Sequence, residues 1–428
     1  MRRRLVRAAT TAATCAALTA TALVAPFTGT ATAAPCGSTS NGSSGVPLPS
    51  FGSLGSSNPE GPPEGPQGPL PYFNNGTTKA IAWVTGPRSE NRTLTRFGIS
   101  GTDIGAAWDN GSGQTLMAFG DTFGNCSAPG NQWRHNVLLR TDDNDLADGL
   151  TVADGIPGVV TSGASVSAAA PNMARQMIDA IGWSGVEVTT IPTSGISIDG
   201  KQYMNYMSVR AWGSAGRWDT NFSAIAVSSD NGQTWSTPLD TLRVNAGVTV
   251  PLPPDLPEVK ANNAKFQQSA YVAGHGADSG WIYQFGTPNG RFGSAYLARF
   301  RPDDILDLSS YEYWTGSTWA NSIDAIPDTN APKVFGAPVT ELSVAWSEYL
   351  GKYIMLHSPP TGLQMRTADR PEGPWSLPRN LVRPTYGIYA PMMLPHSPAL
   401  LGTGPELYYN GSLWADYNVV LMRTTLRR

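Results

Sequence analysis

Two aspartates lie inside apolar segments on either side of a predicted turn. Asp103 and Asp121 flank the stretch DNGSG at 109–113, and a turn centred on Ser112 places the two positions opposite each other. Directly opposed residues on paired strands have Cβ atoms ~5 Å apart. Two carboxylates that close cannot both ionise freely, so one can act as an acid while the other remains a base or nucleophile. Glycoside hydrolysis needs this division of roles.

A purely structural interpretation competes with this chemistry. Aspartates next to glycine commonly cap turns, and we expect that role for Asp109, Asp142, Asp143 and Asp145. Asp103 and Asp121 differ because they lie inside apolar strands, where an unpaired carboxylate is costly. Their pairing depends on the register of the hairpin, since a slip of one residue sends the two side chains to opposite faces of the sheet.

Further polar and aromatic candidates lie in separate segments. Glu341 opens ELSVAW, Arg291 ends GTPNGR and Asn136 ends WRHN, and each could hydrogen-bond sugar hydroxyls or simply pair with a neighbouring side chain. Tyr389 in YGIYAP and Trp218 could stack on sugar rings or pack between sheets. The four histidines show no metal-ligand spacing and are expected to be structural: His135, His275, His357 and His396. We expect no metal and no cofactor.

The composition indicates a chain of short strands. It holds 46 Gly and 35 Pro among 428 residues, and only 14% of its residues are charged. Long helices are disfavoured, because Gly and Pro are the poorest helix formers. A short apolar strand that ends in a few polar residues, called the polar tag below, recurs five times, as NVLLRTDD, SAIAVSSD, SAYLARF, LQMRTAD and VVLMRTTL. Another strand precedes each one, in LMAFGDTF, YMNYMSVRAW, WIYQFGTPNG, YIMLHSPP and ELYYNGSLW.

Five such units predict an all-β fold, a five-bladed β-propeller. The run SSDNGQTW at 228–235 matches the Asp-box turn of sialidase-like propellers, in which the Asp and Gly make a tight turn and the Trp packs between sheets. The N-terminal strand at 80–85 is expected to complete the last blade. A β-sandwich with insertions is the main alternative. One helix is predicted, because Met173, Met177, Ile178 and Ile181 share a helical face.

The N-terminus has the layout of a secretory signal. Four arginines precede a small apolar stretch at 8–24, and Ala31-Thr32-Ala33 offers a cleavage site. We expect residues 1–33 to be a signal peptide, 34–77 a flexible Gly/Ser/Pro-rich linker and 78–428 the propeller. Secretion would remove Cys15 and leave Cys36 and Cys126, which we expect to form a disulfide. The protein would then be extracellular, with no membrane association after cleavage.

Charge bears on the class of partner. The formal net charge is −3, and removal of the four signal-peptide arginines leaves 25 basic against 32 acidic residues, or −7. No basic cluster follows the first seven residues, which argues against a nucleic-acid partner. We expect a monomer.

Several motifs together resemble a known family. GTDIGAAWD, AFGDTFGN, ISIDGKQYMNYMSVRAWG, SSDNGQTW, QFGTPNGRFGSAYLARF, ELSVAW and YGIYAPMMLP are similar to the secreted domain of unknown function 4185, described as glycoside hydrolase family 183. The resemblance covers roughly residues 79–428. It implies an endo-D-arabinanase of actinobacteria that cleaves α-1,5-linked D-arabinofuranosyl chains of arabinogalactan and lipoarabinomannan, with catalytic aspartates at Asp103 and Asp121.

The predicted spacing of the carboxyls bears on mechanism. Retaining glycosidases hold them ~5–5.5 Å apart and inverting ones ~6.5–9.5 Å apart, so directly opposed neighbours favour retention. Inversion would instead point to an acid on another blade, with Glu341 as the candidate. Two other functions remain open, a lectin-like propeller without catalysis and an exo-acting arabinofuranosidase.

Overall fold

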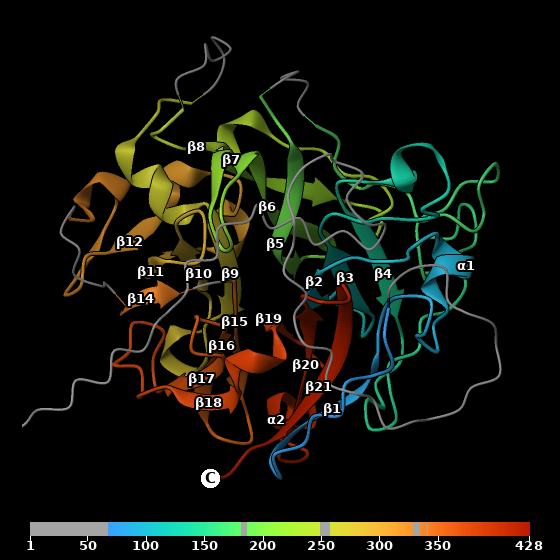
Figure 1. Ribbon diagram of the computed structural model, residues 1–428. Coiled ribbons are helices and arrows are strands. Elements are labelled where there is room, and N and C mark those ends of the chain that lie inside the picture. The colour runs from blue at the N-terminus through green and yellow to red at the C-terminus, as the bar shows by residue number, and fades with distance from the viewer. Residues whose placement is uncertain (1–66, 181–185, 249–256, 328–333, 340) are drawn as a thin grey trace, which may run out of the picture.

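The protein folds as a five-bladed β-propeller, as the repeat predicted. A computed structural model describes residues 67–180, 186–248, 257–327, 334–339 and 341–428. Figure 1 shows five small sheets around a common axis, with one strand of each sheet near the middle. These inner strands are β2 (Ile104–Asp109), β5 (Thr189–Ile198), β9 (Gln268–Ala273), β15 (Leu342–Ser347) and β19 (Ile388–Met393). Each contacts the next, and β19 contacts β2, so the ring is closed.

In each blade the first three antiparallel strands run outward in chain order. The second strands are β3 (Thr115–Phe119), β6 (Lys201–Trp212), β10 (Ile282–Thr287), β16 (Lys352–His357) and β20 (Glu406–Leu413). The third strands are β4 (Val137–Thr141), β7 (Trp218–Ser228), β11 (Gly293–Phe300), β17 (Leu363–Ala368) and β21 (Asn418–Thr425). The recurrent strand with its polar tag is therefore the third strand of every blade, and the strand before it is the second.

The outer edges of the blades differ. The outer strands are β8 (Arg243–Val244), β12 (Glu312–Trp314), β13 (Trp319–Ala320) and β18 (Arg379–Val382), while β14 (Phe335–Val339) pairs with β11. β1 (Thr78–Trp83) pairs antiparallel with β21, which confirms that the N-terminal strand completes the last blade. Two strands that are far apart in sequence, β1 and β21, thus pair in the last blade and close the ring.

Helical structure is limited to short turns in the described part of the chain. The α-helices are α1 (Thr93–Phe97) and α2 (Pro398–Leu401). The 3-10 turns are η1 (Pro129–Gln132), η2 (Leu239–Thr241), η3 (Ala261–Phe266), η4 (Gly276–Asp278), η5 (Pro302–Asp304), η6 (Leu308–Ser310), η7 (Ile323–Ala325) and η8 (Pro384–Tyr386).

The helix predicted from Met173, Met177 and Ile178 is wrong, and Ile181 lies outside the described residues. The segment instead lies along β4, where Gln176 bridges Val137. The Asn136 side chain accepts hydrogen bonds from the backbone N–H groups of Met177 and Ile178, so these amides are not available for helical bonds. Tertiary contacts have overridden the helical spacing.

Apolar side chains fill the space between neighbouring blades. One cluster joins β3 and β4 to β6 and β7, and comparable clusters lie between the other adjacent pairs of blades. Trp235 packs against the first of these, while Asp230 Oδ1 accepts a hydrogen bond from Thr234 N at 2.9 Å. The Asp box is therefore a structural turn, as expected.

Candidate active site

The β2–β3 hairpin has one residue more on β2 than the predicted register allows. From Asp109 to Ala106 the pairing centres on residue 112, as predicted. Ile104 and Gly105 then form a bulge, both with positive φ (70° and 68°), and Ile104 pairs with Phe119. The Gly120 N–H donates to the Asp103 carbonyl at 3.1 Å. Asp103 therefore faces Gly120, and the predicted pairing with Asp121 is wrong by one residue.

The two aspartates nevertheless reach the same pocket. A side chain at Gly120 would place its Cβ 2.6 Å from Asp103 Oδ1, so glycine leaves the space that the Asp103 carboxyl occupies. Asp103 and Asp121 both line a cavity of about 280 Å³ at the end of the ring where β2 begins. The bulge thus brings both carboxyls into one site by a different route from the one predicted.

Asp103 is held by a phenol and lies near two further charges. The Tyr389 hydroxyl donates to Asp103 Oδ2 at 2.8 Å. Burial raises the pKa of Asp103 to about 6; the Tyr389 bond opposes this rise, the Glu341 carboxylate adds to it, and Arg291 and Tyr417 oppose it. Burial makes this carboxyl less acidic. The two tyrosine hydroxyls and the Arg291 cation partly reverse that effect, because they favour the ionised form.

Asp121 has fewer groups that favour its charged form. Thr189, the first residue of β5, donates its hydroxyl to Asp121 Oδ1 at 2.5 Å. Burial raises the pKa of Asp121 to about 7, Thr189 opposes the rise, the charge of Asp103 adds to it and Trp133 opposes it. The charge of Asp103 thus couples the two carboxyls, and Asp121, which has fewer groups that favour ionisation, holds its proton to higher pH.

Arg291 and Glu341 form an ion pair beside Asp103. Arg291 Nη2 lies 2.6 Å from Glu341 Oε1, and its Nε also contacts both carboxylate oxygens at 3.0 and 3.1 Å. The guanidinium lies over the ring of Tyr389, 4.5 Å from its centroid. Burial lowers the pKa of Arg291, but Glu341, together with Tyr389 and Asp103, more than offsets this, so the pKa is raised and the cation is retained.

The predicted substrate-binding residues divide into two groups. Arg291 and Glu341 line the pocket with the aspartates. Tyr389 is buried behind Asp103 and binds its carboxylate, so it positions the acid and does not offer a stacking face. Asn136 is fully buried, and its amide donates to Ile178 O and Thr190 O. We therefore correct its predicted contact with sugar hydroxyls to a structural role.

Several pocket residues were missed. Trp133 and Trp212 line the cavity and are 37% and 41% exposed, and Trp414 and Tyr417 lie in the turn between β20 and β21. The sequence motif WRHN was recognised as a candidate through its last residue, Asn136. It is the first residue, Trp133, that lines the pocket. Trp212 ends β6, while Trp414 and Tyr417 lie between β20 and β21, and nothing in the sequence marked which of these side chains face the pocket. Trp218 lines the same cavity and is buried, with its ring 6.0 Å from that of Trp212.

Comparison with known proteins identifies the family. The pattern of the family described as "Domain of unknown function (DUF4185)" matches residues 88–423. The chain belongs to the DUF4185 family. It is also 25% identical over 292 residues to notoamide biosynthesis cluster protein J of Aspergillus sp. (strain MF297-2), covering 66% of this chain and 70% of that protein. A second relative, protein J' of Aspergillus versicolor, is 24% identical over 288 residues and covers 66% and 72%.

One solved structure shares the fold of this DUF4185 chain, and others match it less closely. A protein assigned as a hydrolase from Bacteroides ovatus ATCC 8483 matches with a TM-score of 0.51 and 14% identity, covering 83% of this chain and 93% of that one. The catalytic domain of a GH62 α-L-arabinofuranosidase from Coprinopsis cinerea matches with a TM-score of 0.40 and 12% identity, covering 81% and 98%. At these identities the likeness concerns the fold, and the chemistry has to be argued from the site.

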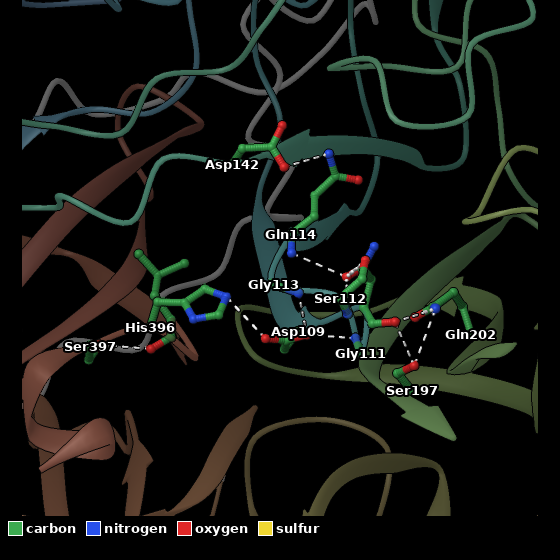
Figure 2. Close-up of polar contacts among 12 residues, drawn as sticks. Asp109, Gly111, Ser112, Gly113, Gln114, Asp142, Ser197, Gln202, His396 and Ser397 are labelled. Carbon is green, nitrogen blue, oxygen red and sulfur yellow. Dashed lines mark hydrogen bonds and ion pairs between the residues drawn. The ribbon is translucent and has the colours of Figure 1, made fainter. Parts of the chain in front are cut away.

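The far end of the hairpin anchors the DUF4185 site. Asp109 Oδ1 accepts the Gly111 N–H at 2.5 Å, and His396 Nε2 lies 3.1 Å from the other carboxylate oxygen. Figure 2 shows both contacts. Gln202 from β6 donates to the Asn110 carbonyl at 2.9 Å. The turn of the hairpin is thereby tied to the last blade and to the second, which fixes the end of β2 opposite the pocket.

The remaining turn aspartates are structural. Asp143 and Asp145 accept backbone N–H groups two residues further on, at 3.1 and 3.3 Å, which confirms their capping role. Asp142 instead accepts the Gln114 amide at 3.0 Å (Figure 2). None of these three lines the pocket of Asp103.

Three of the histidines have structural contacts. His396 pairs with Asp109 as described, His275 stacks on Trp346 with centroids 4.0 Å apart, and buried His357 accepts from Arg366 Nε at 3.4 Å. His135 differs, because it contacts Thr189. Within the described ranges, no group of three or more His, Cys, Asp or Glu side chains could hold a metal ion.

Two further features concern the predicted export. Cys126 is disulfide-bonded, while Cys36 lies outside the described residues, so the predicted pair stays a prediction. No helix in the described part of the chain is long and apolar enough to cross a membrane.

Proposed function

We propose that this DUF4185 chain is a secreted glycoside hydrolase in which Asp103 and Asp121 share the catalytic work. The observation that carries the proposal is the pair of partly buried carboxyls on one pocket, with the pKa of each raised and the charge of Asp103 acting on Asp121. Two titratable groups whose surroundings separate their protonation are typical of acid and base assignments. The exposed faces of Trp133 and Trp212 at the same pocket are suited to packing against sugar rings.

The surroundings favour distinct roles. Asp103 accepts the Tyr389 hydroxyl and lies near the Arg291 cation, so we assign it as the ionised carboxylate that acts as nucleophile or base. Asp121 keeps its proton to higher pH, so we assign it as the general acid that protonates the leaving oxygen. Glu341, the alternative acid, is held by Arg291 in a bidentate ion pair, which favours a positioning role.

The resemblance to glycoside hydrolase family 183 names the substrate in this proposal. We propose endo-acting cleavage of α-1,5-linked D-arabinofuranosyl chains outside the cell, by a single protein chain without a cofactor. Retention of configuration was predicted from directly opposed aspartates. The bulge removes that direct pairing, so the strand register no longer favours retention. The anomeric configuration of the first-formed product decides between retention and inversion.

Product analysis on purified D-arabinan tests the proposal. The wild type should generate new reducing ends as oligosaccharides, and Asp103→Asn and Asp121→Asn should each lower kcat by roughly 10²-fold or more. Asp142→Asn is the matched control, since it is an exposed aspartate of the same blade away from the pocket, and it should retain full activity. Release of single sugars would instead indicate exo action, and binding without cleavage would indicate a lectin.

A further inference from the structure

His135 is connected to Asp121 through one hydroxyl group. His135 Nδ1 lies 3.2 Å from Thr189 Oγ1, and the same oxygen lies 2.5 Å from Asp121 Oδ1. The three residues come from three segments of the chain. Asp121 follows β3, His135 precedes β4 and Thr189 begins β5. The Trp133 ring packs edge-on against the imidazole, with centroids 4.5 Å apart, and also lines the pocket.

The direction of these hydrogen bonds follows from the protons available. The Thr189 hydroxyl carries one proton, and it donates that proton to Asp121 Oδ1. With that proton donated to Asp121, the Thr189 oxygen accepts from His135, and this order requires the imidazole hydrogen on Nδ1. The reverse order would run from an Oδ1–H of Asp121 through Thr189 to an unprotonated Nδ1, so the tautomer of the ring distinguishes the two. Burial lowers the pKa of His135 below its ordinary value of 6.5, with Asp179 opposing the shift, so the imidazole is neutral at neutral pH. A neutral imidazole has a single N–H, and the first order of donation places it on Nδ1.

This arrangement distinguishes the two oxygens of Asp121. In this order Oδ1 is occupied as the acceptor of the Thr189 hydroxyl, which leaves Oδ2 as the oxygen that carries a proton. Trp133 also hydrogen-bonds this carboxyl. We propose that His135 and Thr189 are positioning residues that direct the transferable proton of Asp121 to Oδ2 through an Nδ1–H to Oγ1–H to Oδ1 chain. The inference rests on the proposed role of Asp121 as the general acid, and it deepens that role without adding a step to the reaction.

Other charged and titratable groups also act on this chain. Asp103 lies on the segment before β2, Tyr417 in the turn after β20, and Asp179 on the segment after β4, where Gln176 donates to it. Asp103 raises the pKa of Asp121, and Asp179 raises that of His135. A change at Thr189 leaves these charges in place, so its effect on Asp121 can be separated from theirs.

The first test compares pH profiles on D-arabinan. Because the Thr189 bond lowers the pKa of Asp121, Thr189→Val should move the alkaline limb of kcat/KM upward, by about half a pH unit, and lower kcat about tenfold. Thr189→Ser should restore both. Thr190→Val removes the neighbouring hydroxyl, which binds Asn136 and Ile178 O, and should leave the profile unchanged. His135→Ala should shift the limb in the same direction, with no further shift in a Thr189→Val background.

The second test needs no substrate and so separates this inference from the proposed function. Nitrogen-15 NMR of the His135 ring should show the Nδ1–H tautomer near pH 7.5, and carbon-13 titration of the Asp121 carboxyl should show its pKa rising in Thr189→Val. An Nε2–H tautomer, or an Asp121 titration that Thr189→Val leaves unmoved, would overturn the inference even if the protein cleaves arabinan. An inactive wild type that passes both NMR tests would overturn the proposed function alone.

Discussion

Burial of two carboxyls is the residue-scale feature on which the site depends. The same desolvation that keeps Asp121 protonated near neutral pH also costs folding free energy when it ionises. Asp103 carries a smaller form of the same cost, reduced by Tyr389. The carboxyls that are proposed to be reactive are also the groups whose ionisation destabilises the fold. Replacing either one with an uncharged side chain should therefore lower activity and raise stability.

Asp121→Asn should therefore stabilise the fold in a pH-dependent way. The folded-state pKa of Asp121 is raised from 3.8 to about 7, so the folded protein holds a proton that the unfolded chain has lost, and stability falls as the pH rises through this window. Asparagine cannot ionise. The gain should be near zero at pH 4 and reach ~1–3 kcal/mol at pH 8, a value reduced from the full shift because part of the side chain faces the pocket.

Denaturant unfolding at pH 4, 6 and 8 measures this gain. Asp142→Asn, with its exposed side chain, is the control and should change stability little at any of the three pH values. A stability equal to or below that of the wild type at pH 8 would mean that Thr189 and Trp133 compensate the charged carboxylate fully, contrary to our expectation.

How far residue chemistry can be predicted from sequence depends on what each residue needs from its neighbours. Asp103 and Asp121 were recognisable because carboxyls in apolar strands need a reason to be there, and Arg291 and Glu341 because they adjoin inner segments. Thr189 had no such signal, since a threonine at a strand start is ordinary. Its role arises only when β5 of one blade lies against the end of β3 of another, which is a property of tertiary packing.

At the scale of elements, the bulge at Ile104 and Gly105 decides where Asp103 lies. The repeat of strands was predictable, because each third strand carries the same pattern of apolar residues and tag. The bulge was not, because one extra residue leaves the apolar composition of β2 unchanged. Gly105 is the one local clue, since its φ of 68° suits glycine and a Cβ there would lie 2.9 Å from Asn410 Nδ2.

Gly105→Ala should consequently lower activity as well as stability. We expect a loss of ~1–3 kcal/mol from the positive φ and the contact with Asn410. Relief of this strain would shift the bulge and move the Asp103 carboxyl, so kcat should fall even in the fraction that stays folded. The measurements are thermal unfolding and kcat on D-arabinan per folded molecule.

Gly113→Ala provides a matched control on the same hairpin. Gly113 also has a positive φ, 89°, but no heavy atom lies within 4 Å of the Cβ it would gain. This variant should lose a comparable share of stability from its backbone alone and keep its kcat. If the two substitutions lowered kcat equally, the bulge would not be what positions Asp103.

At the scale of the whole molecule, the last blade combines three strands from the C-terminal part of the chain with β1, which precedes the first blade in sequence. β1 pairs with β21 over five residue pairs, with Trp83 buried in the cluster between the last two blades. The inner strands of the last blade carry Tyr389, and the adjoining turn carries Tyr417 and Trp414. Closure of the last blade therefore supports the site directly, because these side chains face Asp103 or line its pocket.

Removal of residues 1–83 should accordingly open the propeller. Without β1 the outer edge of β21 loses its partner and the cluster around Trp83 is exposed, so we expect the Tm to fall by ~10 °C or more and the activity to be lost. Removal of residues 1–66 is the control, since it takes away the predicted signal, most of the predicted linker and Cys36 alike while leaving β1 in place. That shorter truncation loses the disulfide but keeps β1, so its Tm should stay well above that of the longer one. Because both truncations lack Cys36, a difference between them cannot come from the predicted disulfide, and equal Tm values would show that β1 does not close the ring.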